Sequence, residues 1–121
     1  LLELIQKMRE RFPDILIVSN NGDPVLCDCV FFLDAFVLES LNTTYDFQTK
    51  EYKEQPVKYR SDRSQKVSQI AHQYQLPVFV IDYSPENENS LKQISRQLCK
   101  KQGFIPYNPP IHLQTLSGTT C

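Results

Sequence analysis

The sequence lacks an excess of charge of one sign, and it lacks a long apolar run. Lysine and arginine total 13 residues against 14 aspartates and glutamates, which gives a formal net charge of −1. This balance creates no long-range field that would attract phosphate backbones, so we expect no nucleic-acid partner. The longest apolar stretch, residues 30–38, is interrupted by Asp34 and is shorter than the roughly 20 residues that cross a bilayer. We therefore expect no membrane-spanning helix, and the first residues do not have the basic-then-apolar pattern of a signal peptide.

The motifs of several enzyme classes are also missing. No GxGxxG, GxxxxGK[ST], HExxH or GxSxG pattern occurs, so nucleotide-binding folds, zinc peptidases and serine hydrolases have no support. The four cysteines are Cys27, Cys29, Cys99 and Cys121. Because they and the two histidines, His72 and His112, are scattered without the spacing of a ligand set, we predict no metal and no cofactor. We expect the cysteines to be small buried thiols.

Apolar residues recur at helical spacing or in short continuous runs along most of the chain, whose 121 residues suffice for one domain. The expected order is helix 1–12, strand 15–18, short helix 24–33, strand 34–39, aromatic loop 42–60, a helix from Ser61 or Asp62 to Tyr74, strand 78–81, helix 91–99 and strand 104–107. We expect both faces of these apolar strands to be covered, as in parallel sheets.

The alternation of helices and strands predicts an α/β protein built of parallel βα units. Two architectures remain open: the second half of a (β/α)8 TIM barrel, or a small open flavodoxin-like sheet with helices on both faces. We favour the half barrel, a piece of a longer protein, because the sequence begins in a helical pattern. Residues 1–110 would form the partial barrel, and residues 111–121 a polar C-terminal tail. Its open strand edges would need an N-terminal half-barrel or self-association to cover them.

Polar residues follow every predicted strand, at the edge where α/β enzymes place their active sites. They are Asn20 and Asn21 after the first strand, Glu39 and Ser40 after the second, Asp82 and Tyr83 after the third, and Tyr107 and Asn108 after the fourth. Asp34 opens its strand and belongs to the opposite end. Two carboxylates among amides and tyrosines suit glycoside hydrolysis, in which one carboxylic acid protonates the leaving oxygen and a second carboxylate attacks or activates water. Aromatic side chains of the 42–60 loop could stack on sugar rings.

Structural roles are the alternative for these candidates. Glu39 would then pair with a helix-end amine or with Arg60, and Asp82 would brace the fold. The charges between Lys50 and Arg63 are mixed in sign and are most simply solvated. On this interpretation the chain is a non-enzymatic α/β binding or interaction module, or a carbohydrate-binding relative that has lost catalysis.

Four segments of the chain occur in a characteristic order. A helix is followed by Phe-Pro-Asp-Ile-Leu-Ile-Val-Ser-Asn-Asn-Gly, and then come Asp-Ala-Phe-Val-Leu-Glu-Ser-Leu, Val-Phe-Val-Ile-Asp-Tyr and Gly-Phe-Ile-Pro-Tyr. In their order and spacing these segments resemble glycoside hydrolase family 114, the TIM-barrel family typified by endo-α-1,4-polygalactosaminidase. The resemblance runs from Leu1 to Tyr107 and implies that these segments are strands five to eight of a barrel.

The resemblance also implies roles for the candidates. Glu39 takes the place of the family's strand-six glutamate and would be the acid/base. The expected substrate-binding residues are Asn20, Asn21, Asp82, Tyr83 and Tyr107. The family's other essential carboxylate, an aspartate in the first half of the barrel, has no match here, so the isolated chain is expected to be inactive. The implied substrate is an α-1,4-linked galactosamine-type polysaccharide, and the implied location is extracellular or periplasmic.

Overall fold

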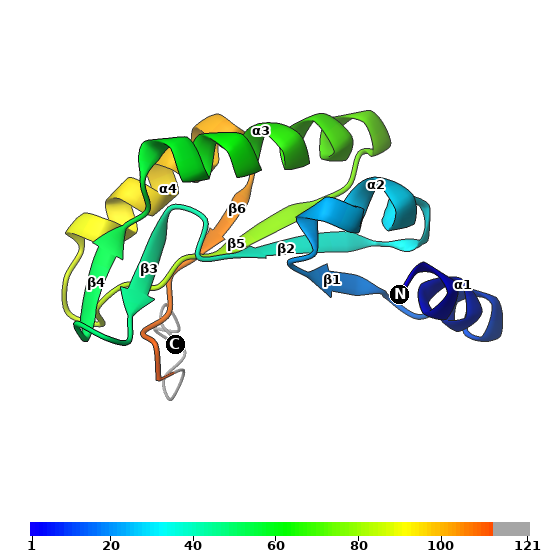
Figure 1. Ribbon diagram of the computed structural model, residues 1–121, viewed down its shortest axis with the longest axis horizontal. Coiled ribbons are helices and arrows are strands. Elements are labelled where there is room, and N and C mark those ends of the chain that lie inside the picture. Colours follow the sequence, from blue (N-terminus) through cyan, green and yellow to red (C-terminus); the bar gives the residue numbers. More distant parts are fainter. Residues whose placement is uncertain (113–121) are drawn as a thin grey trace, which may run out of the picture.

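The computed structural model describes residues 1–112 of the chain, in which four parallel strands form one sheet (Figure 1). The strands are β1 (Val18–Asn20), β2 (Ala35–Glu39), β5 (Val78–Ile81) and β6 (Ile105–Tyr107). The helices are α1 (Leu2–Arg11), α2 (Leu26–Cys29, flanked by the 3-10 turns Asp23–Val25 and Val30–Phe32), α3 (Val57–Tyr74) and α4 (Ser90–Gln102). Two further strands, β3 (Thr43–Asp46) and β4 (Glu51–Glu54), form an antiparallel hairpin. None of the helices within residues 1–112 is long and apolar enough to cross a membrane.

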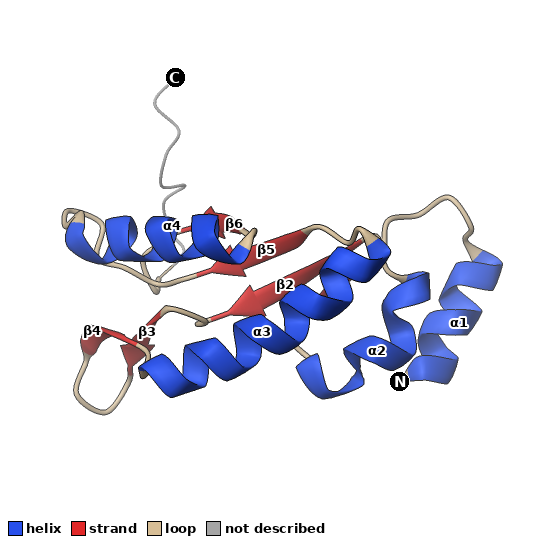
Figure 2. Ribbon diagram, turned by 90° about the horizontal axis from the view of Figure 1, so that it is seen from above, coloured by secondary structure: helices blue, strands red, loops and turns tan. Residues whose placement is uncertain are grey.

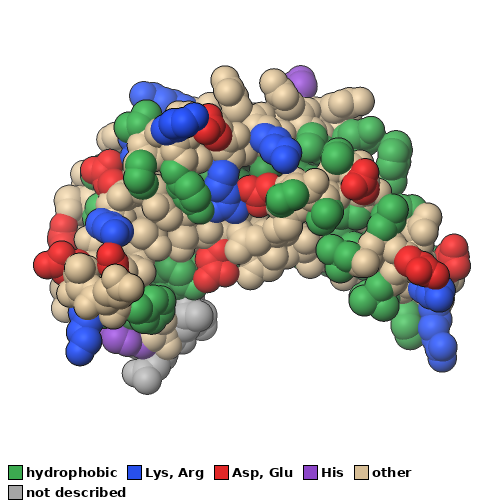
Figure 3. Space-filling view, in the orientation of Figure 1, with side chains coloured by type: hydrophobic (Ala, Val, Ile, Leu, Met, Phe, Trp, Pro, Cys, Tyr) green, Lys and Arg blue, Asp and Glu red, His purple; other side chains and the backbone are tan. Residues whose placement is uncertain are grey.

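The sheet has the strand order of a barrel segment. Its order β1-β2-β5-β6 follows the chain, whereas a flavodoxin-like sheet reverses its order at a switch point. Helices α2, α3 and α4 lie over one face of the sheet, and α1 lies beside α2 at the outer end (Figures 1 and 2). Among residues 1–112 no helix covers the opposite face, and the molecule is hollowed on this side (Figure 3). The predicted α/β class with parallel βα units is confirmed, in the form of part of a TIM barrel rather than an open sheet covered on both faces.

The core lies between the helices and the covered face of the sheet. Phe36 and Leu38 of β2 and Val80 of β5 are fully buried there against Val67 of α3. The strand residues between them point to the open face, where Phe79 of β5 remains 40% exposed. The prediction that both faces of the strands are covered is therefore wrong for the described residues, because successive side chains of a strand point to opposite faces and the helices cover only one of them.

The first strand begins later than the sequence predicts. Pairing with β2 starts at Val18, while Leu16, expected inside the strand, is 79% exposed. Arg9 of α1 donates to the Ile15 carbonyl oxygen at 2.8 Å, and the Ile17 amide donates to Oδ2 of Asp34 at 2.8 Å. The first bond ties residue 15 to α1, and the second ties residue 17 to the residue before β2, whose amide also donates to the Ile17 carbonyl oxygen at 2.8 Å. The strand consequently includes residues 19 and 20, which were expected to be loop.

The region expected to be a long aromatic loop is a hairpin followed by the first turn of α3. Tyr45 and Tyr52 are register partners, with ring centroids 4.9 Å apart, and Phe47 packs edge-on to Tyr45 at 5.1 Å. Helix α3 begins at Val57, before the predicted start at residue 61 or 62, because Pro56 stands at its N-cap and its fixed φ suits a helix entrance. The hairpin lies beyond the carboxyl end of β2 (Figure 2).

The cysteines differ in their surroundings. Cys29 and Cys99 are buried free thiols, as predicted, but Cys27 is exposed, so the prediction is wrong for that residue. Cys27 lies on the outer side of the short helix α2, opposite the side that buries Leu26 and Cys29. Cys121 and most of the predicted polar tail, residues 113–121, lie outside the described residues.

Candidate functional site

Glu39 ends β2 with its carboxylate between two side chains from the neighbouring strands. Tyr83, which follows β5, donates its hydroxyl to Oε1 at 2.5 Å, and Asn20 at the end of β1 donates Nδ2 to Oε2 at 3.2 Å. The register explains the arrangement, since Glu39 pairs with Ile81 and Asn20 pairs with Val37. All of these side chains share the open face of the sheet. Three of the predicted site residues are thus brought together at the carboxyl ends of the strands.

Asn21 supports the backbone of Glu39. Its Oδ1 accepts the Glu39 amide hydrogen at 2.9 Å. Its own φ of 59° places it in the left-handed region, which asparagine tolerates better than most residues. Because its side-chain oxygen is engaged in this way, Asn21 acts here as a brace between the ends of β1 and β2. A role of Asn21 in binding substrate stays a prediction.

Arg63 of α3 is a residue of this region that the sequence analysis missed. It holds both carboxylate oxygens of Asp23, at 2.6 and 2.9 Å, and also donates to Oδ1 of Asn21 at 3.2 Å and to the Glu39 carbonyl oxygen at 3.3 Å. Its side chain is only 18% exposed, so it is not a solvated charge. The usable signal was its spacing, since residue 63 precedes buried Val67 by one helical turn and shares its face.

The Arg63–Asp23 pair is electrostatically matched. Burial raises the pKa of Asp23, but the hydrogen bond and the charge of Arg63 outweigh it and leave that pKa below its usual value. Conversely, the hydrogen bond from Arg63 to Asp23 raises the pKa of Arg63, so the pair is ionised throughout the neutral range. The pair links α3 to the loops that follow β1 and β2, and it fixes the backbone on which Glu39 stands.

Tyr83 is held as a neutral phenol. Burial raises the pKa of Tyr83 to about 12, and the hydrogen bond to Glu39 and the charge of that carboxylate add to the effect. The residue as a whole is 8% exposed. It therefore presents a fixed hydrogen-bond donor to Glu39 at neutral pH.

Asp82, the second predicted carboxylate, lies elsewhere. It is fully buried under the helices, where its oxygens accept from the Asn42 amide at 2.9 Å, from Asn42 Nδ2 at 3.0 Å and from Ser95 Oγ at 2.7 Å. Its position next to Tyr83 in the sequence turns it to the opposite face of the sheet. The structure does not bring Asp82 to Glu39.

Tyr107 ends β6 in register with Ile81 and Glu39 and shares their face of the sheet. It is 38% exposed, and its backbone oxygen accepts the Asp82 amide at 3.0 Å. Tyr107 lies two strands away from Glu39. Its substrate-binding role stays a prediction.

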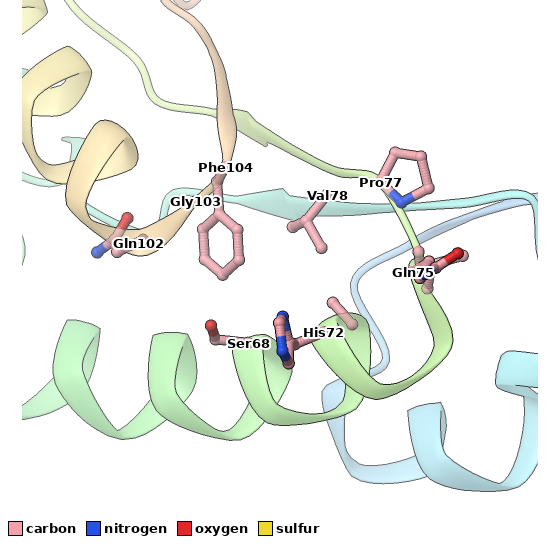
Figure 4. Close-up of a pocket in the computed structure, with 10 residues that line it drawn as sticks. Ser68, His72, Gln75, Pro77, Val78, Gln102, Gly103 and Phe104 are labelled. Atoms are coloured by element: carbon pink, nitrogen blue, oxygen red, sulfur yellow. The ribbon is translucent and has the colours of Figure 1, made fainter.

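A pocket of about 450 Å³ lies at the other end of the strands, between the last turns of α3 and α4 and the start of β5. Ser68 and His72 point from α3 toward Phe104 across it (Figure 4). The residues that line it include no carboxylate, so it does not suit acid/base hydrolysis. Within residues 1–112, no three histidine, cysteine or acidic side chains gather as a metal site would require.

Comparison with known proteins shows the fold. No protein-family model matches the sequence, and no curated protein is significantly similar to it. Among solved structures, the glycoside hydrolase domain of PelA from Pseudomonas aeruginosa superposes with a TM-score of 0.75, and a variant of it with one glutamate replaced by alanine with 0.79. Both are 20% identical to this chain, and the match covers 95% of this chain and 45% of theirs. The chain thus has the fold of somewhat less than half of a TIM-barrel glycoside hydrolase domain.

Proposed function

We propose that this chain is the C-terminal part of a glycoside hydrolase barrel in which Glu39 protonates the glycosidic oxygen. The observation that carries the proposal is the placement of Glu39 at the carboxyl end of a barrel strand, half-buried on the open face and held by Asn20 and Tyr83. TIM-barrel enzymes place their catalytic residues at this end of the barrel. A carboxyl group with a fixed orientation is also what general acid catalysis needs.

The second carboxylate of the reaction would come from an N-terminal half-barrel. Three observations support such a partner. The chain spans only 45% of the PelA domain, the strands β1 and β6 are the edges of the sheet that residues 1–112 form, and apolar side chains face the hollow. Val18 and Ile105, for example, are 51% and 49% exposed there. Closing a barrel removes such edges and buries such a face. Self-association of this chain is the alternative way to cover them.

The substrate class is proposed from the resemblance to family 114: an α-1,4-linked galactosamine-type polysaccharide, cleaved outside the cell or in the periplasm. The hairpin adds support for a sugar chain. It rises from the same end of β2 as Glu39 (Figure 1), and Phe47 is 74% exposed on it. An aromatic ring in this place can pack against the apolar C–H face of a pyranose.

The test is Glu39→Gln in the natural protein that carries this chain, with reducing ends released from partly deacetylated polygalactosamine as the readout. Loss of the acid should lower turnover by about 10²–10⁴-fold, while binding of the polymer is retained. Glu10→Gln, on the exposed side of α1, is the matched control and should leave turnover unchanged. Unchanged turnover in Glu39→Gln would refute the acid role. Binding of oligosaccharide without cleavage by the unmodified protein would identify a carbohydrate-binding relative that has lost catalysis.

A further inference from the structure

The two oxygens of Glu39 are held unequally. Oε1 accepts the Tyr83 hydroxyl at 2.5 Å, whereas Oε2 accepts the Asn20 amide at 3.2 Å. Hydrogen bonds of neutral donors to a carboxylate weaken as the distance grows. The Asn20 bond lies at the long end of the range for an amide donor and is the weaker of the two.

The two donors also differ in exposure. Tyr83 is buried, at 8% exposure, while Asn20 is exposed at the edge of the sheet. A buried hydroxyl that lost its acceptor would be left unsatisfied, which costs about 1–3 kcal/mol. The exposed Asn20 amide can exchange Oε2 for water or for a sugar hydroxyl at almost no cost. A ligand that arrives on the open face would thus displace Asn20 and leave Tyr83 in place.

We propose that Tyr83 is a positioning residue that anchors Oε1 of Glu39 and thereby makes Oε2 the oxygen that exchanges a proton with the substrate. This inference rests on the proposed hydrolase function. A neutral carboxyl group carries its proton on one oxygen and accepts with the other. With Tyr83 donating to Oε1 in both protonation states, the proton lies on Oε2, on the exposed side.

The proton transfer then balances within the site. The Oε2–H bond of Glu39 breaks as an O–H bond forms on the glycosidic oxygen, and the sugar C–O bond breaks with its electron pair going to that oxygen. Glu39 becomes a carboxylate, and its oxygens accept hydrogen bonds from Tyr83 and again from Asn20. This last arrangement is the one seen in the structure. Asn20 is free during the step to bind a hydroxyl of the substrate.

The activity test uses Tyr83→Phe and Asn20→Ala in the natural protein that carries this chain, with the same polygalactosamine substrate. Tyr83→Phe keeps the ring and releases Oε1, so kcat should fall by about 10- to 100-fold with KM nearly unchanged. Asn20→Ala should raise KM and change kcat by less than about threefold. Tyr74→Phe, on the last turn of α3, is the matched control and should change neither. An unchanged kcat in Tyr83→Phe, or an equal loss of kcat in Asn20→Ala, would overturn the proposal.

A second measurement does not need activity. The proton NMR spectrum of the protein should show a downfield, slowly exchanging hydroxyl signal that disappears in Tyr83→Phe, moves upfield in Glu39→Gln and persists in Asn20→Ala. Its absence from the unmodified protein would overturn the role of Tyr83 whatever the enzyme does. Its presence in a protein that cleaves no polysaccharide would leave the anchor standing and would instead refute the hydrolase function.

Discussion

Glu39, the last residue of β2, and Asp82, the first residue after β5, have opposite environments, although both are carboxylates at the ends of neighbouring strands. Glu39 lies half-buried on the open face, with one exposed partner and one buried partner. Asp82 is fully buried on the helix side, where its partners are the amide groups of Asn42 and the hydroxyl of Ser95. The first arrangement suits a reaction with a ligand, and the second suits holding the fold together.

The difference shows that the role open to a strand-end residue depends on the face of the sheet to which its side chain points. Val78 and Val80 of β5 are buried, and Phe79 between them is exposed. If this alternation continues past the end of the strand, residue 82 points to the buried face and residue 83 points to the open face. Each carboxylate also affects a neighbour. Burial, with the charge of Asp82 as a second cause, raises the pKa of Cys99 to about 12, just as burial and Glu39 raise that of Tyr83.

The largest effect that separates the two carboxylates should be on stability. Asp82→Ala removes an acceptor from buried donors on Asn42 and Ser95, and unsatisfied buried donors cost about 1–3 kcal/mol each. We expect the free energy of unfolding in urea to fall by about 2–4 kcal/mol. Glu39→Ala takes the acceptor from one buried donor, the Tyr83 hydroxyl, while the exposed Asn20 amide can bond to water, so it should lower this free energy by only about 1–2 kcal/mol.

The matched control is Ser95→Ala, which removes one donor from the same buried cluster and should cost about 1 kcal/mol. If Glu39→Ala proves as destabilising as Asp82→Ala, the distinction between a reactive and a structural carboxylate is wrong. In that case Glu39 would have a structural role, which is the alternative that the sequence left open.

Much of the fold could be predicted from the sequence because the apolar runs at residues 34–39 and 78–81 coincide with β2 and β5. The first strand was misplaced, since an apolar run does not say where pairing begins. Arg9 bonds to the Ile15 carbonyl oxygen, and Ile17 bonds to Asp34, the residue before β2, so the ladder with β2 itself starts only at Val18. The hairpin was missed because its strands have only four residues each, too few for a clear alternation.

Part of the candidate site could be predicted from the sequence, because the sequence shows which residues end the strands. Strand ends of a parallel sheet meet at one edge, and this rule correctly brought Glu39, Asn20 and Tyr83 together. Asp82 was grouped with them because the alternation along β5 was not applied beyond the end of the strand. Arg63 was missed because it was assigned to a solvated run of charge, although its helical spacing from Val67 placed it on a buried face.

A smaller effect should appear in the titration of Tyr83. Burial raises the pKa of Tyr83 from 10.0 to about 12, with Glu39 as the next cause. Glu39→Gln removes the charge and keeps the burial, so the pKa should fall from about 12 and stay above 10.0. The ¹³C signal of the Tyr83 ring carbon that bears the hydroxyl would follow it. Asp82→Asn, on the other face, should leave the Tyr83 titration unchanged; a shift there would mean that the two faces are electrostatically coupled.

The smallest effect concerns Asp34, which opens β2 at the end opposite to Glu39. The Ile17 amide, followed by the hydrogen bond from Arg9, holds the pKa of Asp34 below its ordinary value of 3.8. A lowered pKa in the folded state stabilises the fold above the unfolded value, and this stability is lost as the pH falls through the folded value. Asp34→Asn should therefore lower the urea midpoint at pH 6 by a small amount, because the pair is exposed to solvent.

At pH 3 the difference between Asp34→Asn and the unmodified protein should be smaller, since pH 3 lies below the ordinary pKa of 3.8, the unfolded chain then binds a proton at Asp34, and part of the stabilisation from the lowered pKa is lost. Glu39→Gln, at the other end of the same strand, is the matched comparison and should change the midpoint little at pH 6. Equal losses from Asp34→Asn at both pH values would mean that the shape of the side chain, and not its charge, fixes the start of β2. With the expected result, the carboxylates near the two ends of β2 have different roles. Asp34, before its start, holds α1 and the segment before β1, and Glu39, at its end, remains available for chemistry.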